Sequence, residues 1–248
     1  MMVAMGMLGL MSACGKDPLP GEDPEEDPIE DPVVTPVRFS ILGDSYSAFK
    51  GYVDPESNDI WYAPPPDNLI DVTSVEQMWW HQVAAKMDWV VEKNNSFSGS
   101  LICNFTDYSG GPYYSPHSFI RRMDGLGDPD VIFVFGGTND VWNGAYVGDY
   151  VYSDWTESQL EQYRPALAYL FENLKRLHPK AAIYFLVHTD LADTDGGQVF
   201  VESVHTVARH YGIEYIDLRG IHKSWDHPNV QGMCDIADQV LAALQEPV

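Results

Sequence analysis

Residues 131–140 have the sequence VIFVFGGTND, in which five apolar residues are followed by two glycines and three polar residues. A short, uninterrupted apolar run is typical of a strand buried on both faces, as the strands of parallel sheets are. A similar run stands at residues 181–187. Three further β-prone runs lie at residues 37–42, 89–92 and 213–218. The sequence therefore predicts five strands.

Helical patterns lie between these predicted strands. Apolar residues recur at intervals of three and four between Leu160 and Leu177, which predicts an amphipathic helix. Residues 156–159 fit a capping box at its start, and we expect Pro165 to break or kink it. Other helical patterns cover residues 75–87, 199–211 and 233–244. Strands that alternate with helices predict a three-layer α/β fold, in which a five-stranded parallel sheet is doubly wound between two layers of helices.

The N-terminus has the features of an export signal. Residues 1–13 form an apolar run without an acidic residue, and the run is too short to span a bilayer, which needs about 20 apolar residues. The small residues before Cys14 resemble a bacterial lipobox, in which the cysteine is lipidated and becomes the mature N-terminus. An ordinary signal peptide with an incidental cysteine is the alternative. Residues 1–14 are thus predicted to be a lipoprotein signal peptide.

An acidic, proline-rich stretch follows. Residues 16–36 contain eight carboxylates, one lysine and six prolines, a composition that cannot pack a core. We therefore expect residues 15–36 to form an extended tether and residues 37–248 to form one domain. Acidic residues behind a lipidated cysteine also resemble the surface-export pattern of some Gram-negative lipoproteins. We expect a cell-envelope lipoprotein that is anchored in the outer membrane through Cys14 alone and is exposed at the surface.

The charge excludes several classes of partner. The chain has 14 basic and 37 acidic side chains, so its formal net charge is −23. A nucleic-acid-binding protein needs a basic face, and adsorption to an anionic lipid surface needs basic residues as well. Neither is expected here. The acidity of residues 37–248 also disfavours polyanionic substrates and leaves neutral esters as the better expectation.

Polar residues follow the predicted strands where ligands bind in such folds, beyond the carboxyl ends. Gly43-Asp44-Ser45 follows the first strand and residues 95–100 follow the second. Residues 136–140 follow the third strand, and Asp226-His227-Pro228-Asn229 precedes the last helix. Together and in this order, these segments resemble the SGNH hydrolases, also called GDSL esterases, over residues 37–244. The resemblance implies the flavodoxin-like fold of that family and hydrolysis of esters.

The resemblance and the chemistry of acyl transfer assign the same roles. Acyl transfer needs a nucleophile, a base that takes its proton, and donors for the oxyanion. Ser45 is the candidate nucleophile and His227 the candidate base. The family pattern implies that the oxyanion hole consists of the backbone N–H groups of Ser45 and Gly99 and the side chain of Asn139. A turn serine and a surface histidine are the alternatives for the first two residues.

The sequence departs from the family pattern at the third member of the triad. The aspartate that usually stands three residues before the histidine is replaced by Ser224. Asp226 is adjacent to His227, and neighbouring side chains in extended backbone point to opposite sides. We therefore expect a backbone carbonyl or Ser224 to hold the second ring nitrogen, and the enzyme to work with a Ser-His dyad.

No cofactor or metal is expected. The sequence contains no H-E-x-x-H, no C-x-x-C and no G-x-S-x-G motif, and Asp44 is expected to form structural hydrogen bonds. Cys103 and Cys234 form a disulfide in one interpretation and remain two free thiols in the other.

The predicted loops near the site are rich in aromatic residues, which suit sugar rings. They are Tyr52, Trp61, Tyr62, Trp79, Trp80, Tyr113, Tyr114, Trp142, Tyr146, Tyr150, Tyr152 and Trp155. For Trp79 and Trp80 we expect packing against the core instead. No long apolar lid is present in the sequence.

We therefore expect a monomeric serine esterase that removes small acyl groups, acetyl above all, from carbohydrates or other small esters. A lysophospholipase or lipase-type acylhydrolase is one alternative. A glycan-binding lipoprotein that kept the fold and lost turnover is the other.

Overall fold

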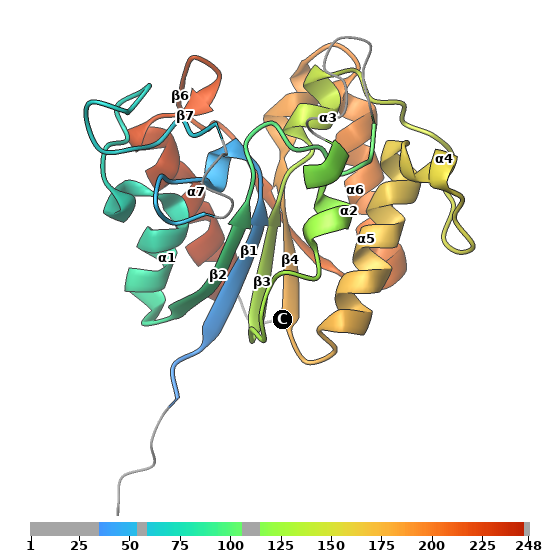
Figure 1. Ribbon diagram of the computed structural model, residues 1–248, viewed down its shortest axis with the longest axis horizontal. Coiled ribbons are helices and arrows are strands. Elements are labelled where there is room, and N and C mark those ends of the chain that lie inside the picture. Colours follow the sequence, from blue (N-terminus) through green and yellow to red (C-terminus); the bar gives the residue numbers. More distant parts are fainter. Residues whose placement is uncertain (1–34, 54–58, 106–114, 246–248) are drawn as a thin grey trace, which may run out of the picture. The chain divides into compact units, whose positions relative to one another are not determined.

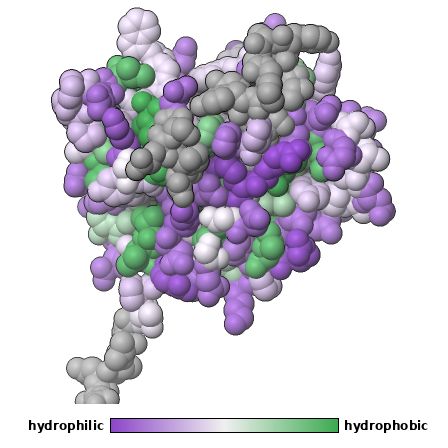
Figure 2. Space-filling view, in the orientation of Figure 1, coloured by the Kyte–Doolittle hydropathy of each residue, from purple (hydrophilic) through white to green (hydrophobic). Residues whose placement is uncertain are grey.

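The computed structural model describes residues 35–53, 59–105 and 115–245, and Pro36–Val248 forms one compact unit. The predicted signal peptide and almost the whole predicted tether lie outside the described residues, so both stay predictions. Among the described residues, no helix has the length and apolar character needed to cross a bilayer. Figure 2 shows a face that is mainly hydrophilic, with apolar residues in small separate patches.

A five-stranded parallel sheet forms the centre of the domain, as predicted (Figure 1). The strand order is β2-β1-β3-β4-β5, and every neighbouring pair is parallel. The strands are β1 (Arg38–Gly43), β2 (Val90–Ser96), β3 (Val131–Phe135), β4 (Ala182–His188) and β5 (Glu214–Leu218). The carboxyl ends of β1, β2 and β3 are therefore adjacent at one edge of the sheet, where the sequence places its polar motifs.

Helices cover both faces of the sheet, which confirms the predicted three layers (Figure 1). On one face lie α1 (Trp79–Met87) and α7 (Val230–Gln245). On the other lie α2 (Phe119–Arg122), α5 (Tyr163–Leu177) and α6 (Gly197–Tyr211). Two short helices, α3 (Thr138–Trp142) and α4 (Glu157–Leu160), complete the α-helices of the described residues.

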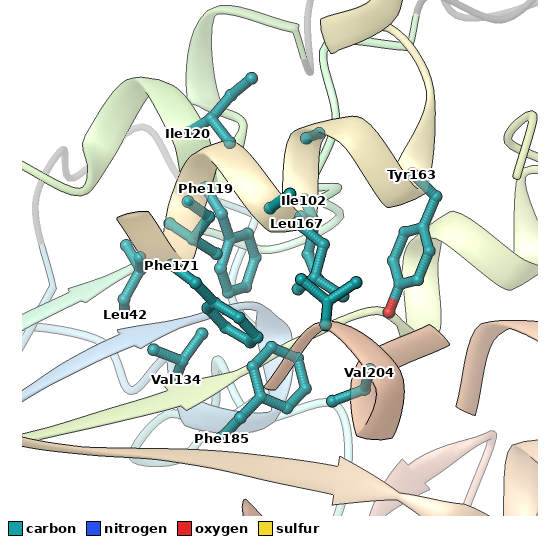
Figure 3. Close-up of a cluster of buried hydrophobic side chains, with 14 of the residues drawn as sticks. Leu42, Ile102, Phe119, Ile120, Val134, Tyr163, Leu167, Phe171, Phe185 and Val204 are labelled. Atoms are coloured by element: carbon teal, nitrogen blue, oxygen red, sulfur yellow. The ribbon is translucent and has the colours of Figure 1, made fainter. Parts of the chain in front are cut away.

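The apolar run of β3 packs into both cores, as expected for a strand buried on both faces. Ile132 and Val134 belong to the cluster under α5 and α6, whereas Phe133 and Phe135 belong to the cluster under α1 and α7. Figure 3 shows the first of these clusters. It includes Leu42, Phe119, Val134, Leu167, Phe171, Phe185 and Val204.

The predicted helix over residues 160–177 requires a correction. The capping box is present, because the Thr156 hydroxyl accepts the N–H of Gln159 and the Gln159 side chain accepts the N–H of Thr156, but it begins the separate short helix α4. The predicted break at Pro165 is confirmed, because α4 ends at Leu160 and a new helix, α5, begins at Tyr163. Pro165 is the third residue of α5, where its missing N–H has no intrahelical partner in any case.

A small antiparallel hairpin was not predicted from the sequence. It consists of β6 (Lys223–Ser224) and β7 (His227–Pro228), with Ser224 paired to His227. Trp225 and Asp226 form its turn, and both have positive φ angles, 52° and 62°. Residues other than glycine rarely adopt positive φ angles. The sequence Trp225-Asp226 therefore gave no sign of a hairpin turn.

We expect Leu167→Ala to destabilise the domain by about 2–5 kcal/mol, the usual cost of emptying a buried leucine site. Leu167 is fully buried in the cluster of Figure 3. The free energy of unfolding, measured by urea titration followed by circular dichroism, tests this. Asp238→Ala on α7 is the control, because this side chain is exposed and its removal leaves no cavity. Equal stabilities of the two variants would contradict the packing described here.

Candidate active site

Ser45 stands at the carboxyl end of β1, on the first turn of a 3-10 helix (Ser45–Ser47). The Asp44 side chain caps this turn by accepting the N–H of Tyr46 at 3.0 Å. Gly43 allows the chain to pass close to its neighbours, since a Cβ there would lie 2.5 Å from Ser96 Oγ and 2.8 Å from Ser47 Cβ. The motif Gly43-Asp44-Ser45 thus produces a tight turn after a buried strand.

His227 meets Ser45 across a separation of 182 residues. Its Nε2 lies 3.0 Å from Ser45 Oγ, and its Nδ1 lies 3.2 Å from the backbone carbonyl of Trp225. Because a carbonyl only accepts, Nδ1 must carry the proton, and Nε2 is left to accept the hydroxyl of Ser45. The carbonyl is one of the two partners expected from the sequence.

The alternative partners of the imidazole are placed elsewhere. The Ser224 hydroxyl accepts the side-chain amide of Asn229 at 3.5 Å, and the side chain of Asp226 is exposed. The two ring nitrogens of His227 instead contact Ser45 Oγ and the carbonyl of Trp225. The described residues therefore bring together a serine and a histidine, with a neutral carbonyl in the position where a triad has a carboxylate.

Burial lowers the pKa of His227 below its usual 6.5. The nearby Lys223 acts in the same direction, whereas the carbonyl of Trp225 and the charge of Asp226 act in the opposite one. The imidazole is therefore neutral at neutral pH. That is the state in which Nε2 can take up a proton.

The residues predicted for the oxyanion hole lie around the same pocket. Ser45, Gly99, Asn139 and His227 all line a cavity of about 420 Å³. Gly99 has a φ of 76°, a conformation that favours glycine and leaves the backbone unshielded. The Asn139 amide nitrogen donates to the carbonyl of Ser100 at 3.1 Å and lies 3.4 Å from Asp44 Oδ2.

Two of the predicted aromatic residues form walls of the pocket. Trp61 and Trp142 line it together with Ile60 and Leu69, and Trp142 is 45% exposed. The expectation for Trp79 and Trp80 is confirmed: both are buried. Their indole N–H groups donate to the hydroxyl and the carbonyl of Ser47 at 3.1 and 3.0 Å.

The other aromatic residues whose positions the structure describes do not line this pocket. Tyr52 borders a separate hollow beside β2. Tyr150 stacks with Tyr152, which stacks in turn with His210 of α6. Tyr113 and Tyr114 lie outside the described residues. The aromatic content of the loops was thus a weak guide to the site.

Arg122 is a buried residue of the site that sequence reasoning missed. Its guanidinium donates to the carbonyls of Gly43 and His117 at 3.0 and 2.6 Å, to Ser100 Oγ at 3.0 Å, and to the carbonyl of Asn95. It therefore joins the ends of β1 and β2 to the loop that carries Gly99. Burial lowers its pKa to about 9, and the neighbouring Asp44 opposes this shift.

Two buried carboxyl groups lie behind the pocket. Burial raises the pKa of Asp44 and of Asp140 to about 7. Asp140 accepts the N–H groups of Ile102 and Cys103 at 2.9 and 3.3 Å, which favours its ionised form and partly offsets burial. Both carboxyls hold backbone in place, in agreement with the structural role expected for Asp44.

Cys103 and Cys234 are both free, so the disulfide interpretation is not supported. The thiol of Cys103 lies 3.2 Å from Asp140 Oδ1, and burial raises its pKa well above the usual value. Within the part of the chain that the structure describes, no cluster of three His, Cys, Asp or Glu residues is suited to a metal ion.

Comparison with known proteins agrees with this geometry. The family model described as GDSL-like lipase/acylhydrolase matches residues 37–244. The chain therefore belongs to this family, the SGNH or GDSL hydrolases. It is an enzyme that hydrolyses ester bonds. Among curated proteins, no significant match was found.

Solved structures give the same result. A protein of Bacteroides ovatus, described as a GDSL-like lipase, is 43% identical with a TM-score of 0.80, over 86% of this chain and 100% of its own. A GDSL-like lipase of Bacteroides uniformis is 44% identical with a TM-score of 0.78, over 84% of this chain and 95% of its own. An acetyl xylan esterase of Butyrivibrio proteoclasticus shares the fold at 15% identity and a TM-score of 0.54, over 86% of this chain and 64% of its own.

The raised pKa of Asp44 predicts a pH-dependent stability. Between its usual pKa of 3.8 and its value of about 7, the folded protein binds a proton that the unfolded chain does not. The stability from that proton is complete below pH 3.8 and is lost as the pH rises through 7. We expect the stability advantage of the wild type over Asp44→Asn to shrink between pH 5 and 7 by on the order of 1 kcal/mol per pH unit.

Urea titrations at several pH values measure this difference. Asp124→Asn is the matched control, because Asp124 is exposed and its difference from wild type should stay flat. A constant difference for Asp44→Asn over the same range would mean that Asp44 is ionised throughout.

Proposed function

We propose that the protein is a serine esterase that removes small acyl groups, acetyl above all, from carbohydrates, with Ser45 as nucleophile and His227 as general base. The distance of 3.0 Å between Ser45 Oγ and His227 Nε2, at the bottom of an open pocket, is the observation that carries this proposal. A hydroxyl that donates to a neutral imidazole is the arrangement needed for nucleophilic catalysis.

The reaction runs in two halves. Ser45 Oγ attacks the ester carbonyl carbon while its proton passes to His227 Nε2, and a tetrahedral oxyanion forms. The backbone N–H groups of Ser45 and Gly99 and the amide of Asn139 donate to this oxyanion. Collapse breaks the bond to the alcohol, which leaves with the proton from His227. Water then attacks the acyl-serine, gives its proton to the same nitrogen, and the acid leaves as Ser45 is restored.

The dyad has an energetic consequence. In serine proteases, loss of the triad aspartate's charge lowers turnover about ten-thousand-fold. Here the carbonyl of Trp225 selects the correct tautomer of His227 but carries no full charge. The carbonyl therefore supplies the orienting role of a triad carboxylate, but it stabilises the imidazolium less than a full negative charge would.

The pocket supports the substrate half of the proposal. Its volume of about 420 Å³ suits a small ester, and the exposed indole of Trp142 offers a flat face to a sugar ring. Asp59 at its edge offers a carboxylate to hydroxyl groups. One observation favours a second candidate, a lipase-type acylhydrolase: Leu69, which is 60% exposed, gives the rim of the pocket an apolar side chain.

Ser45→Ala should lower kcat/KM for p-nitrophenyl acetate by at least about a thousandfold, because the nucleophile is lost. Release of p-nitrophenol measures the rate. Ser224→Ala is the matched control: its hydroxyl bonds Asn229 and not the imidazole, so its rate should stay within a few-fold of wild type. If wild type and Ser45→Ala give the same background rate, the chain is no esterase of this type.

The substrate class is tested by chain length. We expect kcat/KM to fall as the acyl chain of p-nitrophenyl esters grows beyond about four carbons, and acetate to be released from acetylated xylan oligosaccharides. Trp142→Ala should raise KM for the oligosaccharides more than for p-nitrophenyl acetate, because only the former reach the indole face. A preference for long acyl chains would favour the lipase-type alternative instead.

A further inference from the structure

The hairpin that carries His227 is held by two buried tyrosines. Tyr46 Oη donates to the carbonyl of Asp226 at 2.7 Å, and Tyr62 Oη donates to the carbonyl of Pro228 at 3.0 Å. These two carbonyls flank His227. Burial raises the pKa of both phenols well above 10, so both remain neutral donors. The backbone on either side of the imidazole is thereby fixed.

The imidazole ring itself is covered by an indole. The rings of Trp61 and His227 are stacked, with centroids 3.8 Å apart and planes 15° from parallel. Three other aromatic rings contact the imidazole at steep angles of 59° to 70° and at 5.5 to 6.4 Å, namely those of Tyr46, Tyr62 and Trp142. Trp61 thus occupies one face of the ring, while Ser45 and the carbonyl of Trp225 occupy its two nitrogens.

Trp61 is in turn fixed relative to the nucleophile. Its carbonyl accepts the N–H of Leu69 at 3.1 Å, and the carbonyl of the next residue, Tyr62, accepts the N–H of Lys50 at 3.0 Å. Tyr62 also forms a parallel β-bridge with Phe49. Phe49 and Lys50, which follow Ser45 in the chain, therefore fix the backbone of Tyr62 and with it the position of the neighbouring Trp61. If the imidazole rotated away from Ser45, it would lose its stacking contact with the indole of Trp61.

The stack also bears on the charge that forms during the reaction. Transfer of the Ser45 proton turns the imidazole into an imidazolium, which no carboxylate contacts at Nδ1. Lys223 adds a like charge nearby, while the carboxylate of Asp226 is exposed. An indole face attracts a cation, and this attraction is strongest where water is excluded. Stacking is therefore a second contact of the ring, beside the carbonyl of Trp225, that favours its protonated form.

We infer that Trp61 is a positioning residue for His227: its indole keeps Nε2 directed at Ser45 and stabilises the imidazolium that forms in the transition state. This inference rests on the proposed esterase function. It assigns to an aromatic side chain the two roles, orientation and charge stabilisation, that an aspartate has in a Ser-His-Asp triad.

Kinetics of three variants on p-nitrophenyl acetate test the inference. Trp61→Leu should lower kcat about tenfold to thirtyfold, the range given by cation–π energies, and change KM less than about threefold. Trp61→Phe should recover most of kcat, because a phenyl ring can still stack. Trp89→Leu is the matched control: Trp89 is also half-buried but precedes β2 at the opposite end of the sheet. Its kcat should match wild type.

A spectroscopic readout shows the stack independently of turnover. In protein labelled with ¹³C-histidine, the ring-proton signal that disappears in His227→Gln is that of His227. The ring current of Trp61 should place this signal upfield in wild type, and Trp61→Leu should return it towards the position of an unstacked histidine. Circular dichroism checks that each variant is folded, and Trp61→Met, which fills space without a ring, serves if Trp61→Leu is not.

The outcomes separate this inference from the proposed function. If Trp61→Leu, or Trp61→Met in its place, moves the signal of His227 but keeps the wild-type kcat, the positioning role is wrong and the Ser45-dependent esterase stands. A raised KM with unchanged kcat also overturns it, because Trp61 would then contact only substrate. If wild type shows no Ser45-dependent turnover, the proposed function fails and the inference fails with it.

Discussion

The geometry of the site depends on the hydrogen bonds that the guanidinium of Arg122 donates. The carbonyls of Gly43 in β1 and Asn95 in β2 converge on this one cation together with the carbonyl of His117, and the loop with Gly99 joins them through the Ser100 hydroxyl. Buried carbonyls need hydrogen-bond donors. A single fork of five donors satisfies several of them at once. The turn with Ser45 and the loop with Gly99 are therefore held at a fixed distance.

The second half of the site comes from the other end of the chain and is held by different means. Neutral hydrogen bonds, ring stacking and burial determine the position of His227, and none of these requires a charged partner. Such an arrangement avoids the cost of burying another carboxylate beside Asp44 and Asp140. The described part of the domain already contains two buried carboxyls with raised pKa values, Asp44 and Asp140, and the buried Arg122 offsets the charge of Asp44 alone.

Sequence reasoning predicted the fold from local signals. It predicted the pair Ser45 and His227, which the structure places 3.0 Å apart, from motifs that resemble those of the SGNH hydrolases. Buried parallel strands have nearly continuous apolar sequences. Polar residues that follow such strands lie at the same edge of the sheet, because parallel strands have their carboxyl ends there. Helix boundaries were less accessible. The capping box before Leu160 and Pro165 are both true signals, but they did not show that the capping box begins a separate short helix or that the next helix begins at Tyr163.

Residues whose importance comes from contacts distant in sequence could not be found in this way. Arg121 and Arg122 are neighbours with the same chemistry, yet the first is exposed and the second is buried. Trp61 stood among a dozen aromatic residues, and of those that the structure describes, it and Trp142 line the pocket. In both cases residues of the same type have different roles because of contacts with residues distant in sequence, which a local sequence pattern does not show.

The long separation between Ser45 and His227 determines when activity can first arise. The proposed nucleophile follows the first strand of the domain, whereas the proposed base lies on a hairpin beyond β5, the last strand of the sheet. A growing chain that ends before His227 holds a serine turn without a base. Hydrolysis by this pair therefore requires nearly the whole length of the domain.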